Sequence, residues 1–337
     1  MKPRSLLSSL SPSRRAANQA KAREADLLRW TVKVLGSDLV QRHYDAGLAG
    51  PKAEVPPEPV PTGLTSRACR QADIESPWLR HWSQVLGAPP FYHRKLWEDC
   101  FILQALWENG AMQPGRTALC FAVGQEPLPA VLASRGVAVL ATDIDAADGR
   151  AQDWVRTGQH GTGTDPLHRP HLSDRAAFER MVRFRIVDMA AIPADLRQGG
   201  FDMVWSACAM EHLGSLEGGC DFVLAAMECL KPGGIAVHTT ELNLDAGEET
   251  LEDGPTVLYR PRHLAALAER LAAAGHRMLA PDLDPGHGIL DRFVDVPPYD
   301  PARWPMGLIS PPHLRLSVGG YAATSVGIVA IKGVDAT

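Results

Sequence analysis

The sequence predicts an α/β fold in which helices cover both faces of a mostly parallel β-sheet. Short apolar runs alternate with segments of helical periodicity through the second half of the chain. Such alternation is typical of parallel strands joined by crossover helices. At 337 residues, the chain is long enough for one core of roughly 200 residues with additions.

The composition indicates a soluble globular protein. Hydrophobic residues make up 45% and charged residues 22%, and no apolar run approaches the roughly 20 residues that a membrane span needs. The formal net charge of −5 gives no field that would attract nucleic acid, so we expect no nucleic-acid partner. The six cysteines include no C-x-x-C pair, and the N-terminus lacks the apolar core of a secretory signal. We therefore expect a cytoplasmic protein.

Residues 1–63 predict a basic helical extension followed by a proline-rich linker. The stretch ANQAKAREADLLRWTVKVL favours a helix, which we expect to dock on the main domain. The alternative is a membrane-surface or partner helix. PKAEVPPEPVPTG reads as an extended linker because proline disfavours helix and sheet interiors. Residues 64–116 contain two further expected helices that would cover the core domain, which spans 117–337.

Within the core domain, strands and helices are expected in regular order. Apolar runs rich in β-branched residues predict the strands, and helical periodicity with glycine or proline at the ends predicts the helices. We expect strands over 117–123, 137–141, 184–187, 201–206, 235–240 and 324–332. We expect helices over 128–134, 222–230 and 262–274.

The turn in CFAVGQEPLPA has features of a ligand contact. In an open α/β sheet the ligand lies outside the carboxyl ends of the strands, beside the first strand-to-helix turn. Ala122 and Gly124 are small enough to let backbone approach a ligand. A dinucleotide would need more glycines around its pyrophosphate, whereas S-adenosylmethionine has no phosphate. Glu126 either accepts a bond from a ligand amine or caps the helix, which Pro127 suits as a first-turn residue.

Two acids follow successive strands. Asp143 lies about twenty residues past the turn, where an acid can bind both ribose hydroxyls. Asp188 ends the third strand, where its carboxylate could receive an adenine amino group while Met189 supplies apolar surface to the ring.

These segments together resemble the class I, Rossmann-like S-adenosylmethionine-dependent methyltransferases. The resemblance runs from about residue 96 to 332 and rests on CFAVGQEPLPA, ATDID, IVDM, FDMVWSACAMEHLGS and LKPGGIAVHTTELNL. The G-x-E-P-L-P turn looks like that of a bacterial subgroup often found among carbohydrate-modifying enzymes. The resemblance implies a doubly wound, seven-stranded sheet with an antiparallel last strand, and S-adenosyl-L-methionine as cofactor with S-adenosyl-L-homocysteine as product.

The cofactor candidates lie at the ends of the first four strands. They are Ala122, Val123, Gly124, Glu126, Asp143, Ile144, Asp188, Met189 and Ser206. The family's usual acid before the first loop glycine is replaced by Cys120, and that glycine by Ala122. The methionine end of the cofactor is therefore expected to be held differently from the family pattern.

Methyl transfer needs an aligned acceptor and, for a hydroxyl, a base that removes the proton. The segment SACAMEHLGS supplies Glu211 and His212, and AVHTTELN supplies Glu241 and Asn243. We take Glu211, His212 and Glu241 as catalytic candidates, with a backbone-bonded structural histidine as the alternative for His212. Asn243 is a substrate candidate.

Further substrate candidates lie in two loops. Trp154 and His160 fall in or beside a polar insertion that reads as a loop or lid, and a core anchor is the alternative for Trp154. Asp291, Asp295 and Tyr299 fall before the last strand, where acids and an aromatic ring could bind a polyhydroxylated acceptor; a rigid, proline-braced crossover is the alternative. The histidines of the insertion match no standard zinc spacing, so we expect no metal.

The sequence thus predicts methyl transfer to an oxygen of a small-molecule or carbohydrate acceptor. Two alternatives stay open: a nicotinamide-dependent oxidoreductase on a similar sheet, and a binding module that keeps the fold without catalysis. The turn holds only one glycine, which disfavours the oxidoreductase. Cys120 and Ala122, which replace the family's usual acid and glycine, are consistent with a binding module.

Overall fold

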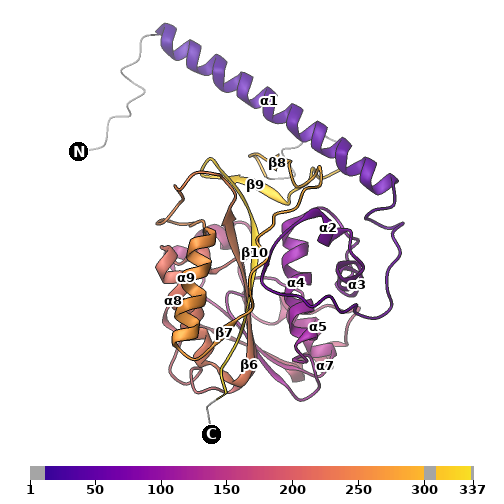
Figure 1. The fold of residues 1–337 in the computed structure, drawn as a ribbon, viewed down its shortest axis with the longest axis vertical. Coiled ribbons are helices and arrows are strands. Elements are labelled where there is room, and N and C mark those ends of the chain that lie inside the picture. Colours follow the sequence, from indigo (N-terminus) through magenta and orange to yellow (C-terminus); the bar gives the residue numbers. More distant parts are fainter. Residues whose placement is uncertain (1–11, 300–308, 335–337) are drawn as a thin grey trace, which may run out of the picture.

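A computed structural model gives the fold of residues 12–299 and 309–334. Figure 1 shows three layers, with the central sheet between two groups of helices. One face is covered by α8 (Leu216–Glu228) and α9 (Pro261–Ala273). The other is covered by α2 (Gln71–Ile74), α3 (Pro77–Val85), α4 (Arg94–Glu108), α5 (Leu128–Ser134) and α7 (Arg175–Met181). The predicted α/β fold is confirmed.

The main strands follow the order β4, β3, β2, β5, β6, β10. Their bounds are β2 (Thr117–Cys120), β3 (Ala138–Asp143), β4 (Val182–Ile186), β5 (Phe201–Ala207), β6 (Leu230–Asn243) and β10 (Tyr321–Ile331). The first five pair in parallel, and β10 runs antiparallel to β6. The strand order reverses between β2 and β5, and ligand sites in open α/β sheets lie at such a reversal.

The sheet is larger than the seven strands expected, since the described residues form ten. The additional pairings involve the short strands β1 (Arg67–Ala68), β7 (Arg277–Met278), β8 (Val294–Asp295) and β9 (Arg315–Val318). A two-residue Gly319-Gly320 turn with positive φ at both positions joins β9 to β10. Gly-Gly between two strands is a hairpin signal that the sequence interpretation did not use.

Two element ends differ from expectation for local reasons. Strand β2 ends at Cys120 rather than 123 because Ala122 adopts a left-handed φ of 50° and turns the chain out of the sheet. Helix α8 begins at Leu216 rather than 222 because the Ser215 side chain caps it, accepting a bond from the Gly218 N–H at 3.0 Å.

Apolar side chains form a separate core on each face of the sheet. Helix α4 packs Trp97 and Phe101 toward the strands, and α9 packs Leu264 and Leu267 on the opposite face. A Cβ at Gly327 of β10 would lie 2.1 Å from the Phe101 ring, so this glycine allows α4 to lie against the sheet. This close packing holds the first turn of α4 beside the strand ends.

Among the described residues, the buried side chains of helix α1 (Pro12–Asp45) lie in its second half. The Lys33 Nζ forms a buried ion pair with Asp295 Oδ1 at 2.6 Å, and Ser37 donates to the Ile309 carbonyl at 2.8 Å. His313 bonds the other Asp295 oxygen at 2.7 Å. Residues 1–11 of the predicted extension lie outside the described residues. None of the helices in the described part of the chain has the length and hydropathy of a membrane span.

Lys33→Ala should lower the free energy of unfolding by about 3 kcal/mol, because removing one partner leaves a buried charge on Asp295. Urea unfolding of the full chain measures the change. Lys21→Ala, on the exposed part of the same helix, is the matched control and should change little. Equal stability of the two variants would show that the ion pair does not anchor α1.

Candidate active site

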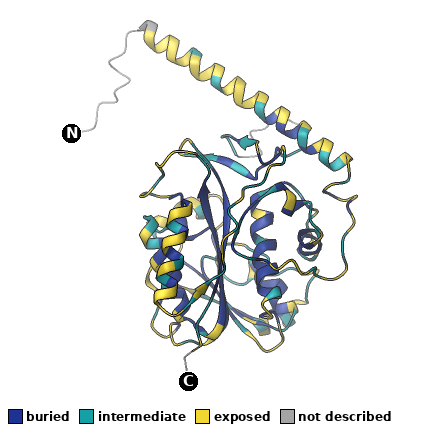
Figure 2. Cartoon of the chain, viewed as in Figure 1, coloured by how far each residue is buried: buried dark blue, intermediate teal, exposed yellow. Residues whose placement is uncertain are grey.

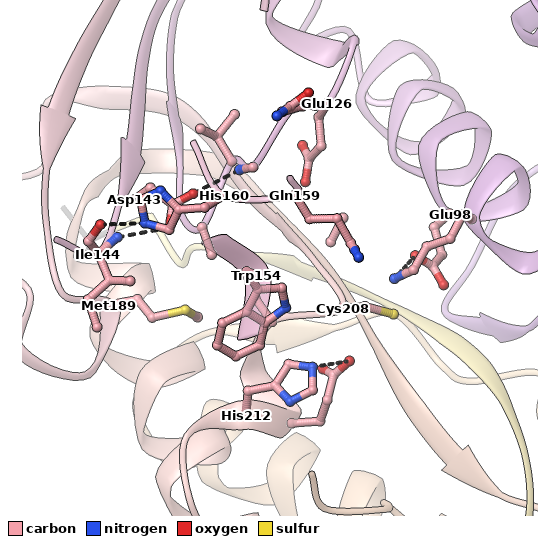
Figure 3. A pocket seen from close by; sticks show the side chains of 18 of the residues that line it. Glu98, Glu126, Asp143, Ile144, Trp154, Gln159, His160, Met189, Cys208 and His212 are labelled. Atoms are coloured by element: carbon pink, nitrogen blue, oxygen red, sulfur yellow. Dashed lines mark hydrogen bonds and ion pairs between the residues drawn. The ribbon is translucent and has the colours of Figure 1, made fainter. Parts of the chain in front are cut away.

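A cavity of about 620 Å³ lies at the carboxyl ends of the parallel strands. The turn after β2, the ends of β3 to β6, the segment around Trp154 and the first turn of α4 all contribute to its wall. Its volume is within the usual range for small-molecule sites. Figure 3 shows labelled side chains from these elements around the cavity, with Trp154 between Met189 and Cys208 in this view.

The turn between β2 and α5 is held in an unusual backbone conformation. Ala122 and Gly124 both have left-handed φ values, of 50° and 51°. A Cβ at Gly124 would lie 2.7 Å from the Gln159 carbonyl oxygen, so glycine is needed for the 158–161 segment to pack on the turn. Strain at Ala122, a residue type that rarely adopts this φ, is of a kind found at ligand sites.

The Asp143 carboxylate joins this turn to the 158–161 segment through hydrogen bonds. One oxygen accepts bonds from the Gly124 and Gly161 N–H groups at 3.0 and 2.9 Å, and the other from the Ile144 N–H at 2.8 Å. His160 donates through Nε2 to the Ile144 carbonyl at 2.9 Å. Asp143 and His160 therefore line the cavity while organising its backbone.

The end of β4 adds a second carboxylate. Asp188 accepts a bond from the Ala190 N–H at 2.9 Å and pairs with Arg150 at 2.7 Å. Met189 beside it is 8% exposed. This wall therefore combines the apolar surface of Met189 with the Asp188 carboxylate, a hydrogen-bond acceptor that is already paired with Arg150.

Two partly buried acids, Glu126 and Asp99, lie at the opposite wall within the longer-range attraction of Lys95. The Trp205 indole N–H donates to Glu126 Oε2 at 3.0 Å, and the Cys120 thiol lies 3.9 Å from the same oxygen. Burial raises the pKa of Glu126 well above its ordinary value. Burial, followed by the charge of Glu98, raises the pKa of Asp99 to about 7. Within the described part of the chain neither Glu126 nor Asp99 forms a side-chain ion pair.

Arg94 is the centre of a buried polar cluster at the ends of β5, β6 and β10. Its Nη1 lies 2.6 Å from Glu241 Oε1, 3.1 Å from Glu98 Oε1 and 3.5 Å from Cys208 Sγ. The same nitrogen donates to the Ser325 hydroxyl at 3.1 Å. Each of these residues is no more than 9% exposed.

Glu98 and Glu241 differ in the pKa of their carboxyl groups, although both contact Arg94. Burial alone would raise the pKa of Glu98, but the charges of Lys95 and Arg94 hold it at about 2. At Glu241 burial outweighs the attraction of Arg94 and raises the pKa to about 7. Glu241 Oε2 has no hydrogen-bond partner, and this side chain lines the cavity. A buried carboxylate oxygen without a donor is costly unless a ligand supplies one.

His212 presents one ring nitrogen for chemistry. Its Nδ1 donates to the Pro255 carbonyl at 2.7 Å, which in the neutral ring leaves the lone pair on Nε2. This Nε2 lies 3.9 Å from Glu211 Oε1. The Trp154 ring meets the imidazole edge-on at a centroid distance of 5.0 Å. The neighbouring Glu211 carboxylate accepts a bond from the Thr240 hydroxyl at 3.0 Å.

Five sequence-based candidates lie outside the cavity. Ser206 bonds His238 within the sheet, and the Asn243 amide bonds Glu249 and Thr250. Asp291 accepts the N–H groups of Gln71 and Gly288. Asp295 belongs to the α1 anchor, and the Tyr299 hydroxyl donates to the Ser317 carbonyl at 2.7 Å. Their polar atoms are used within the fold, so no ligand contact is assigned to them.

The remaining candidates line the cavity together. They are Ala122, Val123, Gly124, Glu126, Asp143, Ile144, Trp154, His160, Asp188, Met189, Glu211, His212 and Glu241. The sequence interpretation missed Arg94, Lys95, Glu98, Asp99 and Arg150, which also line it. The signal for the first four was present in HRKLWEDC, where four charged residues fall in the first turns of a helix whose following residues are mostly apolar.

One group of possible metal ligands lies in the cavity wall. Among the described residues, Cys208, Glu211 and Glu241 each offer an atom within 4.8 Å of the others. Arg94 already pairs with Glu241, and Thr240 donates to Glu211. We assign no metal to this group, and metal independence stays a prediction.

No protein-family model and no curated protein matches the sequence. Among solved structures, the 4+2 cyclase SpnF aligns at 16% identity over 80% of this chain and 88% of that chain, with a TM-score of 0.45. Magnesium protoporphyrin IX methyltransferase from Synechocystis PCC 6803, with bound SAH, aligns at 13% identity over 78% and 87%, with a TM-score of 0.39.

A third structure is phosphoethanolamine N-methyltransferase 2 from Haemonchus contortus, in complex with S-adenosyl-L-methionine. It aligns at 15% identity over 74% of this chain, which spans 56% of that protein, with a TM-score of 0.41. These scores are too low to carry a fold or an activity over to this chain.

Asp143→Ala should lower the free energy of unfolding by about 3 kcal/mol, because three backbone N–H groups lose a charged acceptor and an unsatisfied group costs about 1–3 kcal/mol. Asp145→Ala, two residues on and exposed, should have little effect. Urea unfolding of both variants measures the difference. A smaller loss at Asp143 than at Asp145 would contradict the organising role of this carboxylate.

Proposed function

We propose that this protein is an S-adenosylmethionine-dependent methyltransferase. The observation that carries the proposal is the cavity wall formed by Glu126 and Asp99 beside the turn after β2. These two partly buried acids form no side-chain ion pair in the described chain, and burial raises the pKa of both despite the attraction of Lys95. S-adenosylmethionine brings a sulfonium and an ammonium group to such a wall. Carboxylates near these cations would be stabilised in their charged form.

The same wall disfavours a nicotinamide dinucleotide. A pyrophosphate needs several backbone N–H donors at a helix N-terminus. Here α5 begins after Pro127 and has a second proline at position 129, and neither residue has a backbone N–H. The Glu126 and Asp99 carboxylates would also repel a phosphate in their charged forms. Electrostatics thus favours the cationic cofactor over the oxidoreductase alternative.

The proposed cofactor pose follows the cavity from Glu126 to Met189. The strained Ala122–Gly124 turn would contact the cofactor through its backbone. Asp143 and Ile144 would border the ribose, although Asp143 already accepts three N–H bonds and has limited capacity for more. Asp188 would accept from the adenine amino group beside the apolar surface of Met189. Glu126, placed next to Cys120, would supply the acid for the cofactor ammonium.

We further propose that the acceptor is a hydroxyl of a small molecule or carbohydrate. Its oxygen would attack the methyl carbon in line, the methyl–sulfur bond would break with its electron pair going to sulfur, and the hydroxyl proton would pass to a protein base. Glu241 Oε2 is unpartnered and its pKa of about 7 suits a base at neutral pH. His212 Nε2 is the second candidate base, and Glu211 borders both.

The remaining expectations belong to the same proposal. Residues 1–63 would form an extension and linker, 64–116 a cover, and 117–337 the methyltransferase domain of a bacterial, cytoplasmic enzyme of the G-x-E-P-L-P subgroup. Trp154 and His160 would form part of a lid over the bound cofactor. A catalytically inactive binding module is the alternative, and release of S-adenosyl-L-homocysteine on incubation with candidate acceptors would exclude it.

Glu126→Gln should weaken S-adenosylmethionine binding by about 1.5 to 3 kcal/mol, the contribution of a hydrogen bond to a charged group. Isothermal titration calorimetry with S-adenosylmethionine and, separately, NAD measures the affinities. Glu217→Gln, on the first turn of α8, is the control and should bind like the unaltered chain. Tighter binding of NAD than of S-adenosylmethionine would contradict the proposed cofactor.

The affinity for S-adenosylmethionine should rise between about pH 5.5 and 7.5. A cation binds the ionised carboxyl more tightly, and the pKa of Asp99 is about 7, so protonation below that pH removes the attraction. Calorimetry across this range tests the sign, with a shallower slope expected for Asp99→Asn. An affinity that falls as pH rises would contradict the role of these carboxyls.

Loss of the base should slow methyl transfer without weakening the binding of the cofactor. Glu241→Gln keeps the shape but cannot take a proton, so single-turnover rates should fall by about 10² to 10⁴. His212→Ala is compared in the same assay, beside calorimetric cofactor binding for each variant. If the Glu241 variant keeps its full rate and the His212 variant does not, His212 is the base; full rates in both would remove the two residues from proton transfer.

A further inference from the structure

Lys95 brings a charged group to the cavity from the first turn of α4. Figure 2 shows α4 as mostly buried, and among its described residues Lys95 alone is exposed. The side chain is 48% exposed, and its Nζ lies 3.0 Å from Glu98 Oε2. An ammonium group has three N–H donors, so one ion pair leaves capacity for a further acceptor.

The other basic side chains of the cavity wall are engaged elsewhere. Among the described residues these are Arg94 and Arg150. Arg94 is 9% exposed, and its Nη1 already pairs with two carboxylates. Arg150 pairs with Asp188 at the end of the cavity proposed for adenine. Lys95 is therefore the cavity cation with donors available to a bound anion.

The turn after β2 offers few donors of its own to an anion. The N–H groups of Val123, Gly124 and Glu126 bond to acceptors within the fold, at 2.9, 3.0 and 3.1 Å. Pro127, which follows, has no backbone N–H. A carboxylate bound beside this turn would therefore favour a donor from another element of the structure.

Lys95 lies close to the two acids proposed to bind the cofactor ammonium. Lys95 and Asp99 are four positions apart on α4, so their side chains leave the same face of the helix with about 5–6 Å between the Cβ atoms. The charge of Lys95 opposes the rise that burial causes in the pKa of Asp99 and of Glu126. An amino acid carries its ammonium and its carboxylate on one carbon atom, and this wall offers a partner of opposite charge to each.

We propose that Lys95 binds the α-carboxylate of S-adenosylmethionine while Asp99 and Glu126 bind its ammonium group. The inference rests on the proposed function and assigns the part of the cofactor that the pose above leaves without a partner. The Lys95 ammonium would bridge the cofactor carboxylate and Glu98. Glu98 would also keep its contact with Arg94 at 3.1 Å.

The remaining charges of the cavity make the assignment testable. Carboxyl groups outnumber basic side chains in the cavity wall. This excess alone would favour a cofactor analogue that keeps the ammonium and lacks the carboxylate, because the analogue has one more net positive charge. A preference for the complete amino acid therefore requires a cation at the carboxylate.

Isothermal titration calorimetry with two ligands measures that preference. The ligands are S-adenosyl-L-homocysteine and its decarboxylated analogue, which keeps the adenosine, the sulfur and the amino group. The titrations are run at about pH 8, where Asp99, with its pKa of about 7, is ionised. The unaltered chain should bind S-adenosyl-L-homocysteine about 10- to 100-fold more tightly than the analogue, the range for a hydrogen bond between charged groups.

Lys95→Met should remove this preference. It should weaken the binding of S-adenosyl-L-homocysteine about tenfold or more, and the analogue should bind equally well or more tightly because its ammonium loses a repulsion. Lys95→Arg keeps the charge and should keep most of the preference. Lys231→Met is the matched control, because Lys231 is 45% exposed and pairs with the buried Asp202 outside the cavity. This control should discriminate like the unaltered chain.

Equal weakening of both ligands by Lys95→Met would indicate a structural role for Lys95 and overturn the inference. An unaltered chain that binds the two ligands equally would overturn it as well. Both of these outcomes leave the proposed function standing, since the ligands still bind. A chain that binds neither ligand would instead contradict the proposed function and, with it, this inference.

Discussion

The buried contacts of Arg94 are the constraint on which the candidate site depends. One guanidinium nitrogen joins Glu98 on its own helix to Glu241 at the end of β6 and Ser325 in β10. Burying this cation is costly unless several acceptors surround it. The acceptors come from elements far apart in the sequence, so the helix must lie across the strand ends before the charge is satisfied. The position of α4 therefore fixes the floor of the cavity.

Around that floor the charges divide into two groups. Glu98 and Glu241 share Arg94, whereas Glu126 and Asp99 form no side-chain ion pair within the described chain. The first group is paired within the fold, whereas the second group has no ion pair and only the longer-range attraction of Lys95 and, for Asp99, of Arg169. In the proposed function, Glu241 would be the base and the wall of Glu126 and Asp99 would attract the positively charged cofactor, which are the two requirements of methyl transfer to a hydroxyl.

The sequence predicted the layered α/β fold because strand and helix periodicity are local signals. It also predicted the turn at Ala122 and Gly124 and the acids at the ends of β3 and β4, since these follow directly from strand ends. It did not predict the roles of Arg94 and Asp99, because their helix packs on strands that come much later in the chain. The substrate candidates Asp291 and Asp295 lie outside the cavity, and only their long-range contacts with Gln71 and Lys33 show that their oxygens already accept bonds within the fold.

The most direct measurement of the central claim is a crystal structure of the protein soaked with S-adenosyl-L-homocysteine. The account predicts density along the cavity, with the adenine beside Met189 and the amino group within hydrogen-bond distance of the Glu126 carboxylate. The sulfur should point toward Glu241 and His212. An empty cavity at saturating ligand, or a ligand whose amino group lies away from Glu126 and Asp99, would contradict it.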